Sequence, residues 1–96
     1  MKKTLDYQGY LIKSLENKEE AQAYLNAALE NGNIESFLLA LRNVIAAQGG
    51  MSALAEKVHK SRSSLYRTLS DRGNPELKGM YVILRALNMK LIISPS

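Results

Sequence analysis

The chain has 96 residues, of which 46% are hydrophobic and 23% are charged, and its formal net charge is +4. This size and composition predict one soluble domain and exclude collagen-like or proline-rich sequence. With no cysteine and a single histidine, His59, the chain has neither a disulfide framework nor the side chains of most metal sites and nucleophilic triads. We therefore expect no cofactor, no small-molecule substrate and no enzymatic activity.

The hydropathy pattern predicts a cytoplasmic protein. The longest purely apolar runs have four or five residues, far below the roughly 20 that cross a bilayer. Met1-Lys2-Lys3 leads into Asp6, Gln8 and Lys13, whereas a secretion signal continues with an apolar stretch. No membrane partner is expected.

Charge is unevenly distributed along the chain. Residues 1–32 hold four basic and five acidic side chains, residues 33–70 hold five and two, and residues 71–96 hold four and two. The first third is thus slightly acidic, while the rest is basic. A basic region of this kind favours a polyanionic partner.

Residues 1–15 show no sustained hydrophobic period, and we predict an extended or irregular N-terminal arm there. Residues 16–96 form the predicted single helical domain. Asn17 with Glu20 is a typical helix start, and Asn31-Gly32 a typical helix end. The apolar stripe of this helix comprises Ala21, Tyr24, Leu25, Ala28 and Leu29.

A second helix begins after Asn33 and closes at Gly49-Gly50, with a stripe of Ile34, Phe37, Leu38, Leu41, Val44 and Ile45. Two short helices follow, from Ser52 to Val58 and over 62–70, before a loop over 71–75. A fifth helix is predicted over 77–88, its apolar positions being Leu77, Met80, Tyr81, Leu84 and Leu87. The run Leu91-Ile92-Ile93 predicts a short strand. The fold class is therefore all-α: five helices and a short C-terminal strand.

Residues 51–70 have the spacing of a helix-turn-helix. Two helices of this length with a three-residue connection must cross steeply to bury their apolar faces together. Ala55 supplies the small residue where the backbones approach, and Leu54, Val58 and Leu65 supply apolar anchors. His59 and Lys60 stand where this motif usually has glycine and an apolar residue. His59 must therefore adopt a left-handed backbone, at a cost of about 1 kcal/mol.

The second short helix is the predicted recognition helix, entering the major groove of DNA. Its exposed side chains offer hydrogen-bond donors and no carboxylate; they are Arg62, Ser63, Tyr66 and Arg67, with Ser64 at the edge. An arginine there can bind guanine through two hydrogen bonds. Ser52, Lys60 and Asn74 flank the two helices and are candidate phosphate contacts. The alternative is a solvated side chain for the two arginines and for the flanking residues. For Ser63 and Ser64 it is an ordinary helix start, and for Tyr66 it is packing against the neighbouring helix.

Residues 23–91 resemble the probable addiction-module antidote family, HigA-like antitoxins with a lambda-repressor-type (Xre-like) helix-turn-helix. The matching segments are 23–30, Gly49-Gly50-Met51, Leu54-Ala55, Ser64-Leu65-Tyr66-Arg67, Leu69-Ser70, Gly73-Asn74-Pro75 and 84–91, with Asn88 where glycine is usual. The resemblance implies a five-helix lambda-repressor-like fold. It also implies a protein encoded beside a small basic RelE/ParE-like toxin, which it neutralises while repressing their shared promoter on operator double-stranded DNA.

The remaining expectations concern partners. Tyr7, Tyr10, Leu11 and Ile12 are candidate toxin contacts, although they are also suited to covering the protein's own core. A homodimer is expected because one recognition helix makes few contacts. Its interface is expected at the apolar tail Leu91-Ile92-Ile93 and the helix before it. Two alternatives stay open: a free-standing repressor without a toxin, and a protein-interaction bundle that does not bind DNA.

Overall fold

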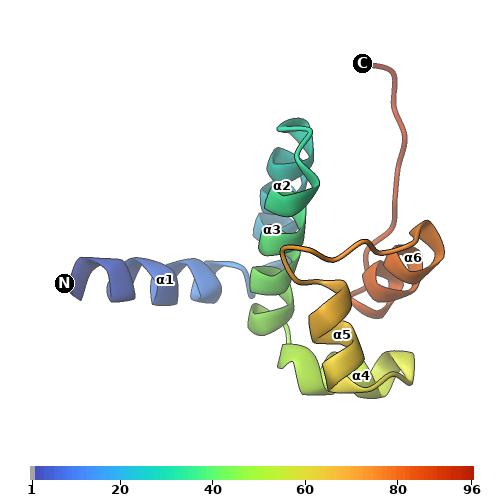
Figure 1. Ribbon diagram of the computed structural model, residues 1–96. Coiled ribbons are helices and arrows are strands. Elements are labelled where there is room, and N and C mark those ends of the chain that lie inside the picture. The colour runs from blue at the N-terminus through green and yellow to red at the C-terminus, as the bar shows by residue number, and fades with distance from the viewer. Residues whose placement is uncertain (1) are drawn as a thin grey trace.

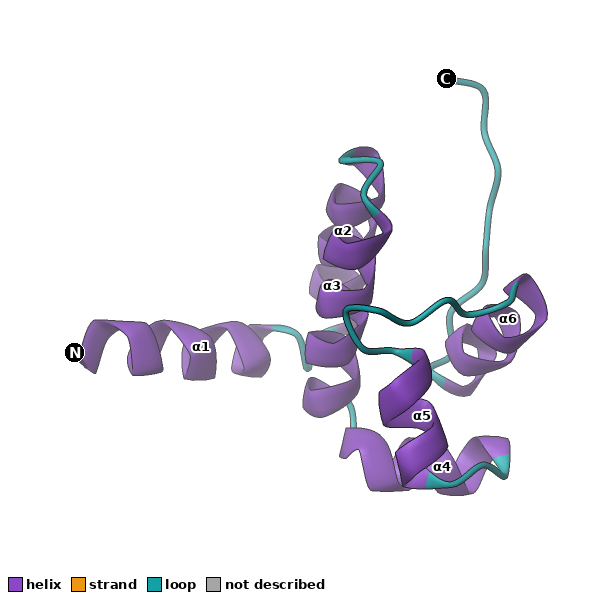
Figure 2. Cartoon of the chain, viewed as in Figure 1, coloured by secondary structure: helices purple, strands orange, loops and turns teal. Residues whose placement is uncertain are grey.

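The computed structural model describes the backbone of residues 2–96 and the side chains of residues 7–96. This part of the chain forms six helices and no strand (Figures 1 and 2): α1 (Lys2–Ser14), α2 (Lys18–Glu30), α3 (Ile34–Ala47), α4 (Gly50–Val58), α5 (Arg62–Thr68) and α6 (Leu77–Ala86). The predicted helical class is confirmed. The count of five is wrong, because the segment expected to be irregular is α1.

Helix α1 forms because a few of its residues find partners on α3. Leu15, just beyond the helix, is 1% exposed, and Leu11 packs against the same core. The Gln48 side-chain amide donates to the Leu15 carbonyl at 2.9 Å, and Gln8 contacts Asn43 at 3.4 Å. The rest of α1 projects away from the body (Figure 1). Two anchoring leucines are too short a pattern to be recognised as a helical stripe in the sequence.

Helices α2 and α3 form an antiparallel hairpin whose ends are fixed by asparagine caps, as predicted. The Asn17 side chain accepts a hydrogen bond from the Glu20 backbone N–H at 2.9 Å, and Asn33 accepts one from Ser36 at 3.2 Å. Such caps satisfy donors that the first helical turn otherwise leaves unpaired. At the turn between the helices, Gly32 adopts a φ of 68°.

Helix α3 is the centre of the core and packs against α1, α2 and α4. Six of its residues are buried: Phe37, Leu38, Ala40, Leu41, Val44 and Ile45. Each fully buried leucine or isoleucine contributes about 1.5–3 kcal/mol, so the fold depends strongly on this helix. No single helix within residues 2–96 is long and apolar enough to cross a bilayer; α3 and α4 reach that length only together, with a 96° bend between them.

Four residues assigned to apolar stripes remain in contact with water: Leu29 (47% exposed), Ile34 (62%), Leu77 (74%) and Tyr81 (47%). Ile34 and Leu77 are the first residues of their helices and Leu29 is in the last turn of α2, where neighbouring helices no longer cover them. Tyr24, expected in the core, is half-buried, and its hydroxyl accepts from the Asn43 side chain at 2.9 Å.

Helix α6 ends at Ala86, and Leu87 beyond it is buried. The Lys18 ammonium donates to the Leu87 carbonyl at 3.1 Å, which joins the start of α2 to the end of α6. Residues 90–96 then leave the body as extended chain (Figure 1). The strand predicted for Leu91-Ile92-Ile93 is absent because no second strand exists within residues 2–96 to pair with it.

Candidate nucleic-acid interface on helices α4 and α5

Helices α4 and α5 form the crossing pair predicted for residues 51–70. The chain turns into α4 through Gly49 and Gly50, whose φ angles of 117° and 91° favour glycine. Leu54, Ala55 and Leu65 are buried between the helices, as the spacing predicted. Val58 is half-buried and packs against the same core.

The connection between α4 and α5 has the predicted left-handed residue. His59 adopts φ 58° and ψ 46°, and the following Lys60 N–H donates to the Ala55 carbonyl at 3.1 Å. Ser61 then caps α5 by accepting from the Ser64 N–H at 3.0 Å. These backbone contacts fix how α5 leaves the turn and therefore which of its side chains face outward.

The outward face of α5 carries most of the predicted contact residues. Arg62, Ser63, Tyr66 and Arg67 are exposed, while Ser64 is half-buried. The Arg62 guanidinium carbon lies 5.7 Å from the centre of the Tyr66 ring, within range of a cation–π interaction. This contact restrains a side chain that otherwise has many rotamers.

A groove runs beside α5, between it, α6 and the 70–76 loop. Its lining brings together four of the predicted contact residues. Lys60 and Asn74 are candidate phosphate contacts, and Ser64 and Arg67 belong to the predicted recognition helix. Ser52, on α4, is exposed but is not part of this groove. Arg72 also lines the groove but was not among the contact residues predicted from the sequence. Its basic side chain, two positions before Asn74, is the one feature of the sequence that points to it.

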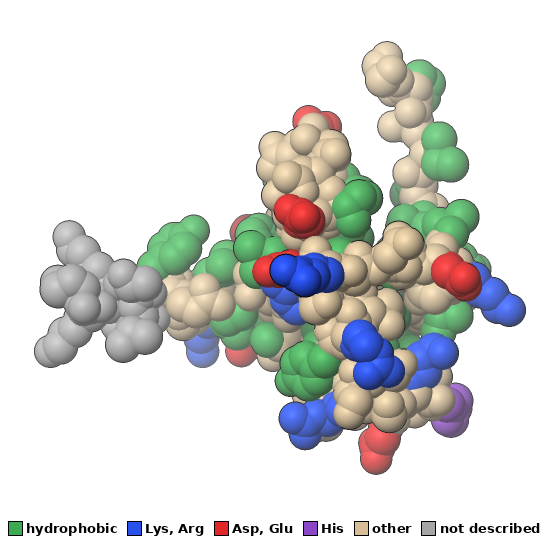
Figure 3. All heavy atoms as spheres, viewed as in Figure 1, with side chains coloured by type: hydrophobic (Ala, Val, Ile, Leu, Met, Phe, Trp, Pro, Cys, Tyr) green, Lys and Arg blue, Asp and Glu red, His purple; other side chains and the backbone are tan. Residues whose placement is uncertain are grey.

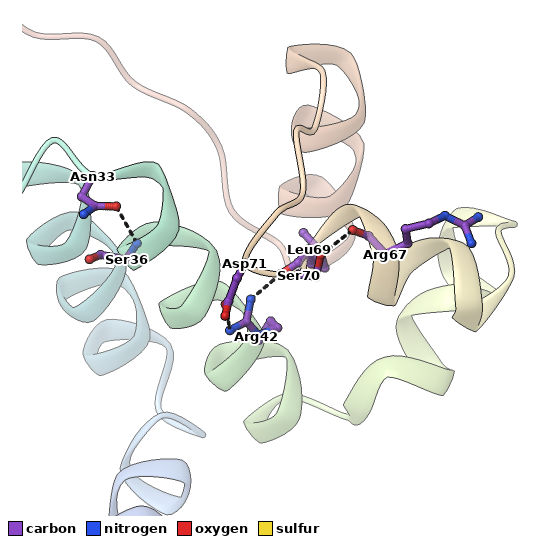
Figure 4. Close-up of polar contacts among 7 residues, drawn as sticks. All are labelled: Asn33, Ser36, Arg42, Arg67, Leu69, Ser70 and Asp71. Carbon is purple, nitrogen blue, oxygen red and sulfur yellow. Dashed lines mark hydrogen bonds and ion pairs between the residues drawn. The ribbon is translucent and has the colours of Figure 1, made fainter.

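The loop after α5 is held tightly against the helix. A Cβ atom on Gly73 would lie 1.9 Å from the Thr68 carbonyl oxygen, so only glycine fits there. From α3, Arg42 donates to the Leu69 carbonyl and forms an ion pair with Asp71 at 3.1 Å (Figure 4). The Arg42 guanidinium thus neutralises the negative charge of Asp71, the residue next to Arg72 in the sequence.

The segment over residues 57–70 is strongly positive, although Glu76 also lines the groove. Residues 57–70 contain four Lys or Arg side chains and no Asp or Glu, and Figure 3 shows basic side chains gathered over α4 and α5. Such a surface can donate hydrogen bonds to phosphates and to base edges. Among the described side chains, no three His, Asp or Glu residues gather as a metal site requires.

The four candidate toxin contacts on α1 divide into two kinds. Tyr7 and Tyr10 are 67% and 78% exposed. Leu11 and Ile12 are half-buried, and Leu11 packs against the core. The two alternatives drawn from the sequence therefore apply to different residues: Leu11 covers the core, whereas the tyrosines are free to meet a partner.

Comparison with known proteins identifies the family. The family model described as "Probable addiction module antidote protein" matches residues 4–95. An uncharacterized protein of Haemophilus influenzae is 38% identical over 82 residues, which cover 85% of this chain and 84% of that protein. No solved structure matches the chain. The match over almost the whole length shows that this chain belongs to the family of probable addiction module antidote proteins.

Proposed function

We propose that this protein is the antitoxin of a type II toxin–antitoxin module, neutralising a RelE/ParE-like toxin and repressing its own operon. Membership of an antidote family implies a toxin as partner. The exposed, carboxylate-free face of α5 is the observation that supports the second activity, because it offers donors of the size that the major groove accepts.

In this proposal α4 and α5 act as a helix-turn-helix of the lambda-repressor (Xre-like) type, and the protein is HigA-like. Arg62 and Arg67 read bases, each contributing about 1–3 kcal/mol of discrimination. Ser63, Ser64 and Tyr66 add contacts on the same helix. Ser52, Lys60 and Asn74 bind phosphates on either side, where they fix the register of the protein on the duplex.

Operator recognition by this surface requires two copies. One α5 offers only a few contacting side chains, whereas specific repressors bind operators at about 10⁻⁸–10⁻¹¹ M. A two-fold dimer presents two recognition helices to half-sites about 34–36 Å apart. We place the dimer interface at residues 90–96, and the site of action in the cytoplasm, where operator and toxin are both present.

The DNA-binding half of the proposal is tested on DNA from upstream of the gene. The Arg62→Ala/Arg67→Ala variant should fold normally, since both side chains are exposed, and its operator affinity should fall to that for unrelated DNA. Lys13→Ala/Lys78→Ala is the matched control, because it removes the same charge at exposed positions on α1 and α6. Equal losses in both variants would reject α5 as the recognition helix.

The toxin-binding half is tested by co-expression with the neighbouring small basic protein. Protection of growth, and a complex of the two purified proteins, are expected. A protein that binds its operator but neither protects cells nor binds that neighbour is a free-standing repressor instead.

A further inference from the structure

The longest stretch of the sequence without a Lys or Arg side chain lies in the α2–α3 hairpin, between Lys18 and Arg42. Residues 19–41 contain Glu19, Glu20, Glu30 and Glu35 and no Lys or Arg, and all four carboxylates are exposed. Since the whole chain carries +4 and this stretch carries −4, the remaining residues carry +8. The acidic character of the first third thus belongs to the hairpin rather than to residues 1–15, where three lysines outnumber Asp6.

Two of these carboxylates, Glu30 and Glu35, lie at the free end of the hairpin among exposed aliphatic side chains, whereas Glu19 and Glu20 lie in the first turn of α2, at its other end. Leu29 precedes Glu30 at the end of α2, and Ile34 precedes Glu35 at the start of α3. Leu39, 50% exposed, is one helical turn beyond Glu35 on the same side of α3. We call Leu29, Glu30, Ile34, Glu35 and Leu39 the hairpin tip.

No other described element covers the hairpin tip. The polar contacts between α1 and α3 involve Asn43 and Gln48, at the far end of α3. Helices α4 and α5 lie at that far end as well, as Figure 1 shows. The tip and the basic face of α5 therefore lie toward opposite ends of the molecule. Figure 3 shows acidic side chains at the upper end and several basic ones, with acidic ones among them, toward the lower end.

Charge decides which kind of molecule fits the tip. DNA is excluded because its phosphates are repelled by carboxylates. A second copy in a two-fold dimer would set this patch against itself, so that glutamates face glutamates. A cationic protein meets neither obstacle: its basic residues pair with the acidic rim while apolar side chains cover Leu29, Ile34 and Leu39.

We infer that the hairpin tip is the docking surface for a cationic partner protein. This inference rests on the proposed function, in which that partner is the basic toxin. Aliphatic side chains at the centre of the tip supply the buried contact, and Glu30 and Glu35 supply steering and orientation. Because α5 lies at the other end, a toxin on the tip leaves the DNA-binding face uncovered. The exposed tyrosines of α1 are at most a secondary contact, since residues 1–15 are net basic.

Two matched pairs of variants test the inference, using the purified toxin and the full chain. Glu30→Lys/Glu35→Lys and Glu56→Lys/Glu76→Lys change the net charge equally, but only the first pair lies on the tip; all four residues are exposed. Ile34→Ser and Leu77→Ser each replace an exposed aliphatic first residue of a helix, α3 or α6. Calorimetry at low and high salt gives the toxin affinity, and circular dichroism verifies folding.

We expect both tip variants to weaken toxin binding at least tenfold, the charge effect shrinking at high salt, while both controls stay within about threefold. Operator binding should persist in the tip variants. Equal losses of toxin affinity in tip and control variants would overturn this inference but leave the proposed function standing. A wild-type dimer that the Ile34→Ser substitution dissociates would do the same, because the tip would then be a contact between two copies. A wild-type chain that binds no toxin would overturn the proposed function, and this inference with it.

Discussion

Arg42 and Asp71 form an ion pair, Nη2 to Oδ1 at 3.1 Å, that ties the central helix α3 to the loop after α5. The same guanidinium donates through Nη1 to the carbonyl of Leu69, the C-cap residue that follows α5. One side chain from the core helix therefore fixes both the end of the candidate recognition helix and the loop that carries Arg72 and Asn74.

The two contacts of Arg42 should contribute unequally to stability. Asp71 is 80% exposed, so Asp71→Asn should cost less than about 1 kcal/mol. Arg42→Ala also removes the donor to the Leu69 carbonyl and should cost about 1.5–3 kcal/mol. Urea denaturation of both variants measures the difference. A loss in Asp71→Asn as large as in Arg42→Ala would show that the ion pair, rather than the carbonyl contact, holds the loop.

Gly73 should be irreplaceable where Gly79 is not. Gly73→Ala forces a Cβ against the Thr68 backbone, so the loop must move away from α5; we expect a loss of at least about 2 kcal/mol and weaker operator binding. Gly79 lies inside α6, where an added Cβ would meet no atom within 4 Å apart from its chain neighbours and the backbone of its own helix. Gly79→Ala should therefore stabilise the fold by roughly 0.5–1 kcal/mol. Thermal melts of the two variants should shift in opposite directions.

The C-terminal tail, residues 90–96, should form the dimer interface. Ile92 and Ile93 are 75% and 98% exposed, and Leu91 is 43% exposed, so an unpaired extended segment offers backbone and apolar side chains for pairing with a second copy. Deleting residues 90–96 should convert a dimer into a monomer in sedimentation equilibrium and leave the helical content unchanged. An undiminished dimer after the deletion would place the interface elsewhere.

The exposed tyrosines of α1 and its buried C-terminal end should differ in how strongly their loss destabilises the protein. Tyr7→Ala/Tyr10→Ala should leave the free energy of unfolding within about 0.5 kcal/mol of wild type, and should weaken toxin binding less than Ile34→Ser does. Removing residues 1–15 deletes the buried Leu15 and leaves Gln48 without its carbonyl partner. That truncation should cost about 2–5 kcal/mol. Unchanged melting of the truncated chain would show that α1 is not part of the core.

The sequence by itself determined what depends on local spacing. The caps at Asn17, Asn33 and Ser61, the left-handed His59 and the outward face of α5 all follow from residue types a few positions apart, because caps, turns and helical faces are local interactions.

Only the tertiary structure decided which apolar residues find a partner. Leu11 and Leu15 are too few to indicate a helix, yet α3 lies close enough to bury Leu15 and order α1. Leu29 and Ile34 fit a stripe, yet no other helix within residues 2–96 extends far enough to cover them. Arg42 reaches Asp71 across 29 positions of sequence, and the Leu91-Ile92-Ile93 run has no strand to pair with within residues 2–96. Burial and strand pairing require a second surface, and where that surface lies is a property of the packed helices rather than of local spacing.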